Sequence, residues 1–382
     1  MSATALCPTR VLTPAGFEPD WCVVVERGLI VAVAPSAKVS ENVPRRLLAG
    51  DLLPGFIDLQ VNGGGGVLFN DEPTVDGIAA IAEAHRRFGT TGFLPTLISD
   101  DIETVARAIK AVDAAIGQVV PGVLGIHIEG PFLNPEKKGI HDASKFGILD
   151  ATAIELLTSL QHGRTLVTLA PELAPPGAVR ALVDRGVIVA AGHTAASYED
   201  IQASFVEGLS GFTHLYNAMT QLGSRAPGAV GAALQSRESW GGLIVDGYHV
   251  HPASLRIALA TKGPEHLALV TDAMPTVGSD RKEFRLGGQR IVAEDGRCTA
   301  PDGTLAGSDL DMAQAVRNAE RLLGVEFATA VRMASAVPAS ILGLSAERGS
   351  LQPGLRADLV LVDNEKRVVE TWIGGEAEQV TD

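Results

Sequence analysis

Cysteine is scarce in this chain of 382 residues, which contains only Cys7, Cys22 and Cys298. Because the number is odd and the spacing is wide, the sequence predicts neither a disulfide framework nor a C-x-x-C metal or redox motif. A reducing cytoplasm is the simplest compartment for such a composition.

Basic residues are in deficit, with 31 Lys and Arg against 45 Asp and Glu and a formal net charge of −14. Nucleic acids and anionic membranes bind proteins through an excess of Lys and Arg, so neither is expected as the main partner. A small anionic substrate would need cationic groups placed locally at its site.

Targeting signals and long apolar runs are missing as well. Residues 1–10 lack a basic region followed by an apolar one, and the apolar stretch 21–35 is interrupted by Glu26 and Arg27. We therefore expect neither secretion nor a membrane span.

Hydrophobic residues make up 46% of the chain, enough for a packed core. Its middle part alternates short apolar segments with helix-like ones, the pattern of a parallel sheet covered by helices. The expected strands are residues 52–59, 92–96, 122–127, 165–169, 187–191, 211–214, 242–245 and 267–271, and the expected helices include 75–88, 102–116, 151–160, 198–207 and 252–261. Roughly eight such units in about 290 residues predict a (β/α)8 TIM-type barrel.

Both ends of the chain have a different pattern, of short strands at residues 22–25, 29–33, 358–362 and 368–373. A small sheet needs at least three strands, so the two ends are expected to pair. We predict a small β-sandwich domain from residues 1–52 and 346–382, and a catalytic barrel over 53–345 with an inserted hairpin near 283–300.

Polar residues stand at nearly every predicted strand end, where the loops of a barrel converge on one mouth. In chain order they are Gln60, Asn62, Thr96, His127, Glu129, Glu172, His193, His214, Asp246, His249 and Asp272. Two histidines with a carboxylate suit a divalent transition metal, and we predict Glu129, His193 and His214 as its ligands. Taken singly, each could instead cap or solvate a loop.

Asp272 follows the segment Leu267-Ala268-Leu269-Val270-Thr271, so we expect its carboxylate at the end of a buried strand. Beside a metal, this carboxylate could take a proton from water and return it to a leaving group. A turn cap is the alternative. His249 could stabilise a developing oxyanion, with a structural histidine as its alternative.

Glycine-rich and basic segments near the expected mouth are less specific. The run Asn62-Gly63-Gly64-Gly65-Gly66 lacks phosphate-loop spacing and fits either a loop that approaches a ligand or a plain tight turn. Residues 305–308, with Leu305 and Gly307, could supply backbone donors to a substrate. The pair Lys137-Lys138 is expected to be a solvated loop.

These motifs resemble the amidohydrolase superfamily and, within it, the N-acetylglucosamine-6-phosphate deacetylase family. The segments that carry the resemblance are PGFIDLQVNG (54–63), HIEGPFLN (127–134), KKGIH (137–141), AGHT (191–194), THLYNAM (213–219), DGYHV (246–250), TDAM (271–274) and LAGS (305–308). They occur in the family's order over essentially the whole chain. The resemblance implies the metal-dependent amidohydrolase kind of barrel and hydrolysis of N-acetyl-D-glucosamine 6-phosphate to D-glucosamine 6-phosphate and acetate, in amino-sugar and cell-wall recycling.

The resemblance also implies a role for each matching residue. Glu129, His193 and His214 would bind the metal, Asp272 would act as the base, and His249 would polarise the substrate carbonyl. The implied substrate contacts are His141, Asn217, Ala218, Arg225, His249, Leu305 and Gly307. Arg225 would bind the phosphate in the neighbouring subunit of a homodimer, which would supply the local cation that an acidic protein needs.

One departure from the wider superfamily concerns the metal. Many amidohydrolases have His-x-His after the first strand, whereas this chain has Gln60-Val61-Asn62. We expect one divalent metal per subunit, Zn before Fe, Mn or Co, with Gln60 and Asn62 holding a water or supporting the ligands from behind.

Three other functions stay open on the sequence. A related amidohydrolase acting on a cyclic amide or a different N-acyl sugar would keep the metal set without a phosphate arginine. A barrel enzyme using a Schiff-base lysine would need a lysine at a strand end, and none is evident. A non-catalytic sugar-phosphate-binding protein would bind the ligand without releasing acetate.

Overall fold

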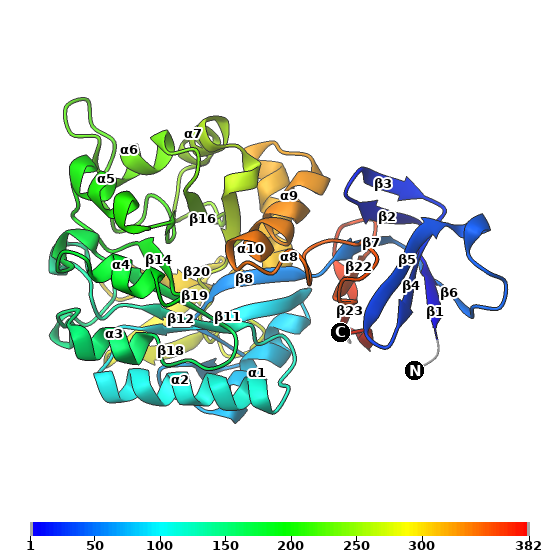
Figure 1. The fold of residues 1–382 in the computed structure, drawn as a ribbon, viewed down its shortest axis with the longest axis horizontal. Coiled ribbons are helices and arrows are strands. Elements are labelled where there is room, and N and C mark those ends of the chain that lie inside the picture. The colour runs from blue at the N-terminus through cyan, green and yellow to red at the C-terminus, as the bar shows by residue number, and fades with distance from the viewer. Residues whose placement is uncertain (1–2, 380–382) are drawn as a thin grey trace.

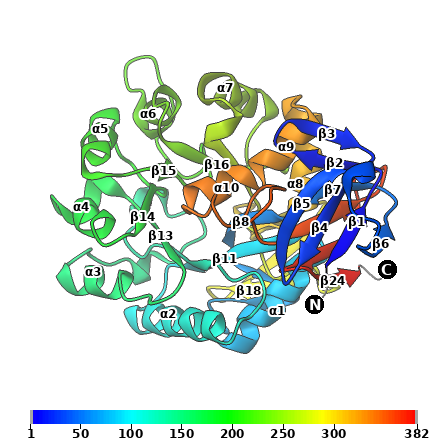
Figure 2. The same ribbon diagram turned by 45° about the vertical axis from the view of Figure 1, so that its right-hand side comes forward.

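The structure is a computed structural model that describes residues 3–379. Figure 1 shows two parts, a barrel wrapped by helices and a smaller group of sheets that contains both chain ends. In the view of Figure 2 the smaller part comes forward, with its blue N-terminal and red C-terminal strands beside one another.

Eight parallel strands form the barrel, each hydrogen-bonded to the next in chain order. They are β8 (Phe56–Val61), β11 (Thr90–Ile98), β12 (Gly125–Glu129), β13 (Arg164–Leu169), β14 (Ile188–Ala191), β15 (Gly211–Phe212), β16 (Trp240–Ile244) and β17 (Leu267–Val270). The ring closes between β17 and β8, where Val61 bridges Ala273 and the Asp272 amide donates to the Gln60 carbonyl at 3.0 Å. The predicted TIM-type fold is confirmed.

Helices cover the outside of the barrel (Figure 1). They are α1 (Val75–Arg86), α2 (Ile102–Gly117), α3 (Ala151–Leu157), α4 (Ala178–Val183), α5 (Tyr198–Glu207), α6 (Gly228–Gln235), α7 (Pro252–Lys262), α8 (Met312–Asn318), α9 (Phe327–Met333) and α10 (Ala336–Ile341). Single turns occur at η1 (Ser36–Lys38), η2 (Pro135–Lys137), η3 (Ala143–Lys145), η4 (Pro171–Leu173) and η5 (Pro264–His266), and a π-helical turn at η6 (Ala319–Leu323). Within residues 3–379, no helix has the length and apolar character needed to cross a bilayer.

Local sequence explains where these helices begin and which face they bury. On α2, Val105, Ala108, Val112 and Ala115 are buried at the three- and four-residue spacing of one helix face. Helix α5 begins at a capping box in which Ser197 and Asp200 bond each other's backbone amides. Both of these helices were expected from the sequence, at residues 102–116 and 198–207.

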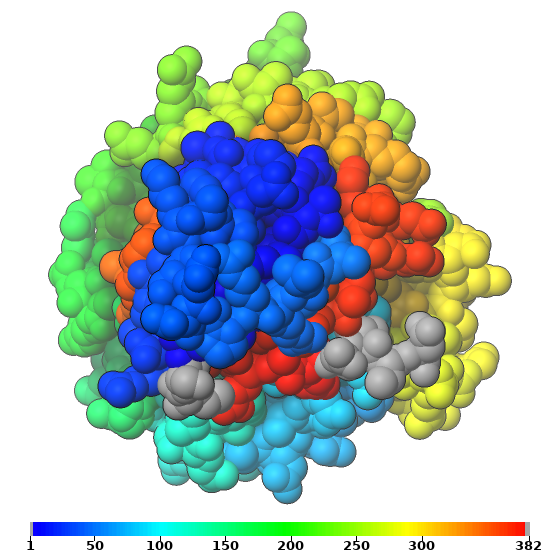
Figure 3. Space-filling view, turned by 90° about the vertical axis from the view of Figure 1, so that its right-hand side faces the viewer, coloured from blue at the N-terminus to red at the C-terminus, as the bar shows by residue number. Residues whose placement is uncertain are grey.

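The two chain ends build a small β domain, as predicted. One sheet has the order β5 (Leu29–Pro35), β4 (Trp21–Glu26), β1 (Thr4–Cys7) and β6 (Arg45–Leu47); the other has β24 (Glu376–Gln379), β23 (Val368–Ile373), β22 (Leu359–Val362), β7 (Asp51–Pro54), β2 (Arg10–Thr13) and β3 (Gly16–Pro19). Apolar side chains from both ends of the chain share one buried cluster, including Val23, Leu52, Leu361 and Trp372. Figure 3 shows the blue N-terminal and red C-terminal segments packed side by side on the face that it draws.

The predicted strand at residues 52–59 is two strands that belong to different sheets. Strand β7 pairs with β22 in the terminal domain, while β8 begins the barrel at Phe56. Gly55 lies between them, and a side chain there would come within 2.1 Å of Thr91 Oγ1. The chain therefore passes from one domain into the other at a position that only glycine can occupy.

Residues 283–308 form an antiparallel sheet of four strands: β18 (Glu283–Leu286), β19 (Gln289–Glu294), β20 (Arg297–Thr299) and β21 (Leu305–Ser308). This sheet has its own buried cluster, which includes Phe284, Ile291 and Cys298. Its last strand is bonded to the barrel, since the Ser308 amide donates to the Asp272 carbonyl at 2.9 Å. The segment 305–308 is thereby held at the end of β17.

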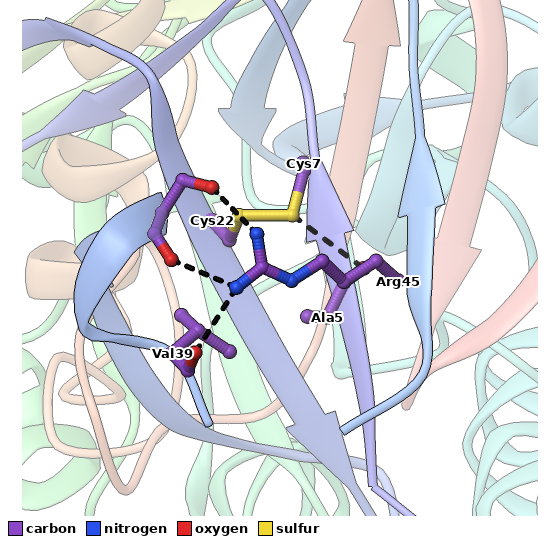
Figure 4. The surroundings of a disulfide bond; sticks show 6 residues. Ala5, Cys7, Cys22, Val39 and Arg45 are labelled. Atoms are coloured by element: carbon purple, nitrogen blue, oxygen red, sulfur yellow. Dashed lines mark hydrogen bonds between the residues drawn. A yellow bond between two sulfur atoms is a disulfide. The ribbon is translucent and has the colours of Figure 1, made fainter. Parts of the chain in front are cut away.

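The prediction about disulfides was wrong. Cys7 and Cys22 lie on the adjacent antiparallel strands β1 and β4 and form a disulfide (Figure 4). Their separation of 15 residues gave no sign of this pairing, because only the register of the two strands brings them opposite each other. Cys298 is a buried free thiol, and burial raises its pKa to about 12. The cysteines therefore no longer argue for a reducing compartment.

An ion pair links the two terminal sheets, and its loss should destabilise the domain. Arg46 of β6 donates to both carboxylate oxygens of Glu370 of β23, at 2.7 and 2.6 Å, and the Glu370 side chain is 3% exposed. Arg46→Met leaves a buried carboxylate unpaired, so we expect a loss of about 2 to 3 kcal/mol, measured by urea unfolding. Arg290→Met, which breaks the exposed pair with Glu283, is the control and should cost under about 1 kcal/mol. Equal effects of the two variants would contradict the prediction.

Candidate metal and substrate site

The carboxyl ends of the barrel strands surround one cavity of about 370 Å³. Glu129 ends β12, and His193, His214 and Asp272 follow β14, β15 and β17, so four separate strands contribute to its wall. Parallel strands bring their carboxyl ends to the same mouth, which is why residues far apart in sequence meet here.

Several of these residues have a left-handed backbone. The φ angles of His193, His214 and Asp272 are 48°, 33° and 53°, and that of Ala218 is 49°. Residues without a glycine's freedom adopt this conformation at a cost, and such strain concentrates at functional sites. Here it turns each side chain from the end of its strand into the cavity.

Glu129, His193 and His214 form a tight buried cluster, with their ligand atoms all within 4.8 Å of one another. His214 Nε2 lies 2.9 Å from Glu129 Oε1 and 3.0 Å from His193 Nε2, and His193 Nε2 lies 3.3 Å from the same oxygen. The His193 ring donates its Nδ1 proton to the Lys137 carbonyl at 2.8 Å, which leaves Nε2 as a free lone pair. Two ring nitrogens and a carboxylate oxygen that face one another in this way fit a divalent cation with nitrogen and oxygen ligands.

The charge state of the cluster follows from its burial and its partners. Burial alone would raise the pKa of Glu129, but the contacts of its carboxylate with the His193 and His214 rings hold it well below its ordinary value. The Glu129 carboxylate therefore stays ionised, as a metal ligand must be.

Asp272 lies beside the cluster and is held by two amides. Its Oδ1 accepts from Asn62 Nδ2 at 2.7 Å and from Gln60 Nε2 at 3.1 Å. The same Gln60 nitrogen donates to Glu129 Oε2 at 3.1 Å, so one amide spans the ligand and the neighbouring acid. Burial and the nearby charge of Glu129 raise the pKa of Asp272 to about 6. Near neutrality such a carboxyl can both accept and return a proton.

His249 lies on the cavity wall with its ring fixed from behind. Its Nδ1 lies 2.6 Å from Asp246 Oδ2, and Asp246 Oδ1 accepts from the Tyr248 and His249 amides. Burial opposes the charge of Asp246, but the hydrogen bond from His249 lowers the pKa of this carboxyl. The carboxylate thus orients the ring so that Nε2 is left for a partner in the cavity.

His141 is a neutral hydrogen-bond donor in the same wall. Its Nδ1 accepts from the Ser99 amide at 3.3 Å, so the ring proton is on Nε2. Burial, together with the neighbouring His193 ring, whose centroid is 4.4 Å away, lowers the pKa of His141 to about 3. The other predicted substrate positions on the wall are Asn217, Ala218, Leu305 and Gly307.

Arg225 does not lie on this cavity wall. It is exposed, in the loop between Ala218 and α6 where the Gly223 amide donates to the Ala226 carbonyl. Within residues 3–379 of one chain, the structure therefore separates Arg225 from the other predicted site residues.

Two other segments differ in detail from the sequence-based view. Lys137, expected in a solvated loop, lines the cavity and binds the His193 ring through its carbonyl. The glycine run forms a tight hairpin of β9 (Gly63–Gly64) and β10 (Val67–Leu68), which is the plain-turn alternative. A backbone carbonyl has no residue-type signal, so its contact with His193 was not predictable.

Most of the chain is similar to known proteins. Residues 52–377 match the model of the amidohydrolase family. The chain is 43% identical to an N-acetylgalactosamine-6-phosphate deacetylase of Shewanella sp. (strain ANA-3), covering 96% of this chain and 94% of that protein. It is 34% identical to an N-acetylglucosamine-6-phosphate deacetylase of Haemophilus influenzae, covering 93% and 94%.

Among solved structures, N-acetylglucosamine-6-phosphate deacetylase from Pasteurella multocida superposes with a TM-score of 0.95 at 33% identity, covering 99% of this chain and 100% of that one. At this coverage the match takes in both the barrel and the terminal β domain. The chain belongs to the amidohydrolase family.

Proposed function

We propose that the protein hydrolyses the acetamide of N-acetyl-D-glucosamine 6-phosphate, giving D-glucosamine 6-phosphate and acetate, as part of amino-sugar recycling. The observation that carries this function is the buried cluster of Glu129, His193 and His214 with Asp272 held beside it by Gln60 and Asn62. The full-length similarity to sugar-phosphate deacetylases supports the substrate class.

Glu129, His193 and His214 would hold one divalent metal, Zn before Fe, Mn or Co. When bound there, such an ion would polarise the acetyl carbonyl and make a water a better nucleophile. The amides of Gln60 and Asn62 occupy the place where a second metal would need histidine ligands. Asn62 Oδ1 is buried with no partner among the described residues, which suits the holding of a water.

Asp272 and His249 then supply the proton transfers and the charge stabilisation. The Asp272 carboxylate takes a proton from the attacking water and hands it to the amine nitrogen as the C–N bond breaks. With both ring nitrogens protonated, His249 donates Nδ1–H to Asp246 and presents Nε2–H to the carbonyl oxygen as that oxygen gains negative charge. The acetyl group, now bonded to the oxygen of the attacking water, leaves as acetate.

The sugar would be held by the polar groups of the same wall. His141 donates from Nε2, Asn217 and the Ala218 backbone reach the sugar, and Leu305 and Gly307 offer backbone groups. Arg225 is exposed and lies outside the cavity of its own chain. It would therefore bind the phosphate in the site of a second copy, within a homodimer. A cytoplasmic location is proposed from the substrate, since a phosphorylated sugar does not cross a bilayer unaided.

N-acetyl-D-galactosamine 6-phosphate is a second candidate substrate, favoured by the 43% identity to a deacetylase of that sugar. The two sugars differ only in the orientation of the C4 hydroxyl, while the acetamide and phosphate ends are the same. Acetate release by the purified, Zn-loaded protein, with kcat/KM measured for both phosphates and for unphosphorylated N-acetylglucosamine, tests the proposal. Activity that ignores the phosphate, or no acetate release at all, would refute it.

Asp272→Asn should abolish turnover and leave metal binding intact. Asparagine keeps the shape of the side chain but cannot take a proton, so we expect kcat to fall about 1,000-fold or more at unchanged Zn content. Asp295→Asn is a matched control, because Asp295 also has a left-handed backbone (φ 53°) and is exposed at the turn before β20. Near-normal turnover by Asp272→Asn would remove this residue from the mechanism.

Removal of the metal should lower thermal stability. A ligand present at 100 times its Kd stabilises the folded state by about 2.7 kcal/mol, so chelation should lower Tm and Zn should restore it. His214→Ala should lose this response to Zn. His162→Ala, which changes a 65% exposed histidine, should keep it. An unaltered response in His214→Ala would contradict the ligand assignment.

Arg225→Ala should raise KM for the phosphorylated sugar about tenfold or more and change kcat little, because a charged hydrogen bond to phosphate persists from ground state to transition state. Arg237→Ala, another exposed arginine, is the control. Mixing Arg225→Ala with Asp272→Asn subunits should restore activity, since the mixed dimer has one site with both residues intact. Absence of restoration in a proven mixed dimer would place Arg225 outside the partner's site.

A further inference from the structure

Glu172 joins two loops that carry site residues, although it does not line the site cavity itself. It lies in η4, directly after β13, and its Oε1 accepts from Asn134 Nδ2 at 2.9 Å and from the Ala195 amide at 2.7 Å. Its Oε2 accepts from the Thr194 hydroxyl at 2.5 Å. One carboxylate therefore accepts three hydrogen bonds, from segments that follow two different strands.

The first of these loops follows β12 and contains Asn134. Lys137, three residues further on, provides the carbonyl that receives the Nδ1 proton of His193. The second segment follows β14, where Thr194 and Ala195 come directly after His193 in the chain. The two segments are also joined directly, because the Asn134 amide donates to the His193 carbonyl at 2.9 Å.

These contacts connect Glu172 to His193 by two routes. Glu172 fixes Asn134, the loop from Asn134 sets the Lys137 carbonyl, and that carbonyl orients the His193 ring. Through Thr194, the same carboxylate fixes the backbone on which the ring is carried. His193 has a left-handed backbone with a φ of 48°, so its position depends on restraints from outside its own segment.

We propose that Glu172 is a positioning residue that holds His193 in its orientation as a metal ligand by tying the loop after β12 to the segment after β14. The inference rests on the metal site of the proposed function. Groups behind a metal ligand fix the ring and its free nitrogen, and their loss weakens metal affinity about 10- to 100-fold.

A carboxylate suits this place because all three of its partners are donors. Glutamine has the same shape, but it has one acceptor oxygen, and its NH₂ group would face a donor where Glu172 presents an oxygen. Glu172→Gln should therefore loosen the junction without changing the volume of the side chain.

The experiment measures the Kd for Zn by competition with a chelator, together with kcat at saturating Zn and the visible spectrum of the Co-substituted protein. For Glu172→Gln we expect a Kd about 10- to 100-fold higher, a shifted Co spectrum, and kcat at saturating Zn within a few fold of the original protein. Thr194→Val removes one donor only and should raise the Kd in the same direction by a smaller factor. If Glu172→Gln does not fold, the Kd of Thr194→Val for Zn still tests the proposal.

Glu207→Gln is the matched control. Glu207 is also half-buried and also bonds a neighbouring segment, where it accepts from the Gly177 and Arg180 backbone amides, but it has no contact with the metal cluster. The Kd of the Glu207→Gln variant for Zn should be unchanged even if the Tm of that variant falls.

A purely structural role for Glu172 predicts a lower Tm of the metal-free protein with an unchanged Kd and Co spectrum, and that result would overturn the inference. If the original protein binds Zn but releases no acetate from either sugar phosphate, the proposed reaction fails while the Kd comparison still decides the role of Glu172. If the original protein binds no Zn, both proposals fail.

Discussion

The buried carboxylate of Glu129 is the constraint on which the site depends. A carboxylate removed from water is costly unless cations or donors surround it, and here two imidazoles and the Gln60 amide converge on its oxygens. The arrangement requires residues from four strands, β8, β12, β14 and β15, to meet within a few ångströms, which the barrel provides by its geometry. The positive φ angles of His193 and His214 show how the backbone adapts to this convergence.

The rest of the structure holds that convergence in place. The barrel closes where the Asp272 amide donates to the Gln60 carbonyl, so the contact that closes the ring also places Asp272. The four-stranded sheet at residues 283–308 then attaches its last strand to the Asp272 carbonyl. The terminal β domain is joined at the start of β8, where Gly55 lets the chain pass between sheets.

Much of this could be predicted from particular residues. The segment 267–270 is apolar and is followed by Thr271 and Asp272, so its strand and the carboxylate at the end of that strand were readable together. Glu129, His193 and His214 have no short-range ligand spacing, and only the expectation that parallel strands share one mouth grouped them. By contrast, the predicted strand 52–59 ran across Pro54-Gly55, although a Pro-Gly pair is a turn signal. The Cys7–Cys22 pairing depends on strand register and was not visible. Glu172 appeared as one more polar strand end, because its three partners lie on other segments.

The sequence by itself determined the order of strands and helices and the chemical type of each strand-end residue, because periodicity and residue chemistry are local properties. Only the tertiary structure decided which of those residues meet. It placed Glu129, His193, His214 and Asp272 on one cavity and left Arg225 outside it, and it joined Arg46 to Glu370 across 324 positions of the chain. Distances between segments depend on how the barrel closes and how the terminal sheets pack, and those are properties of the whole chain.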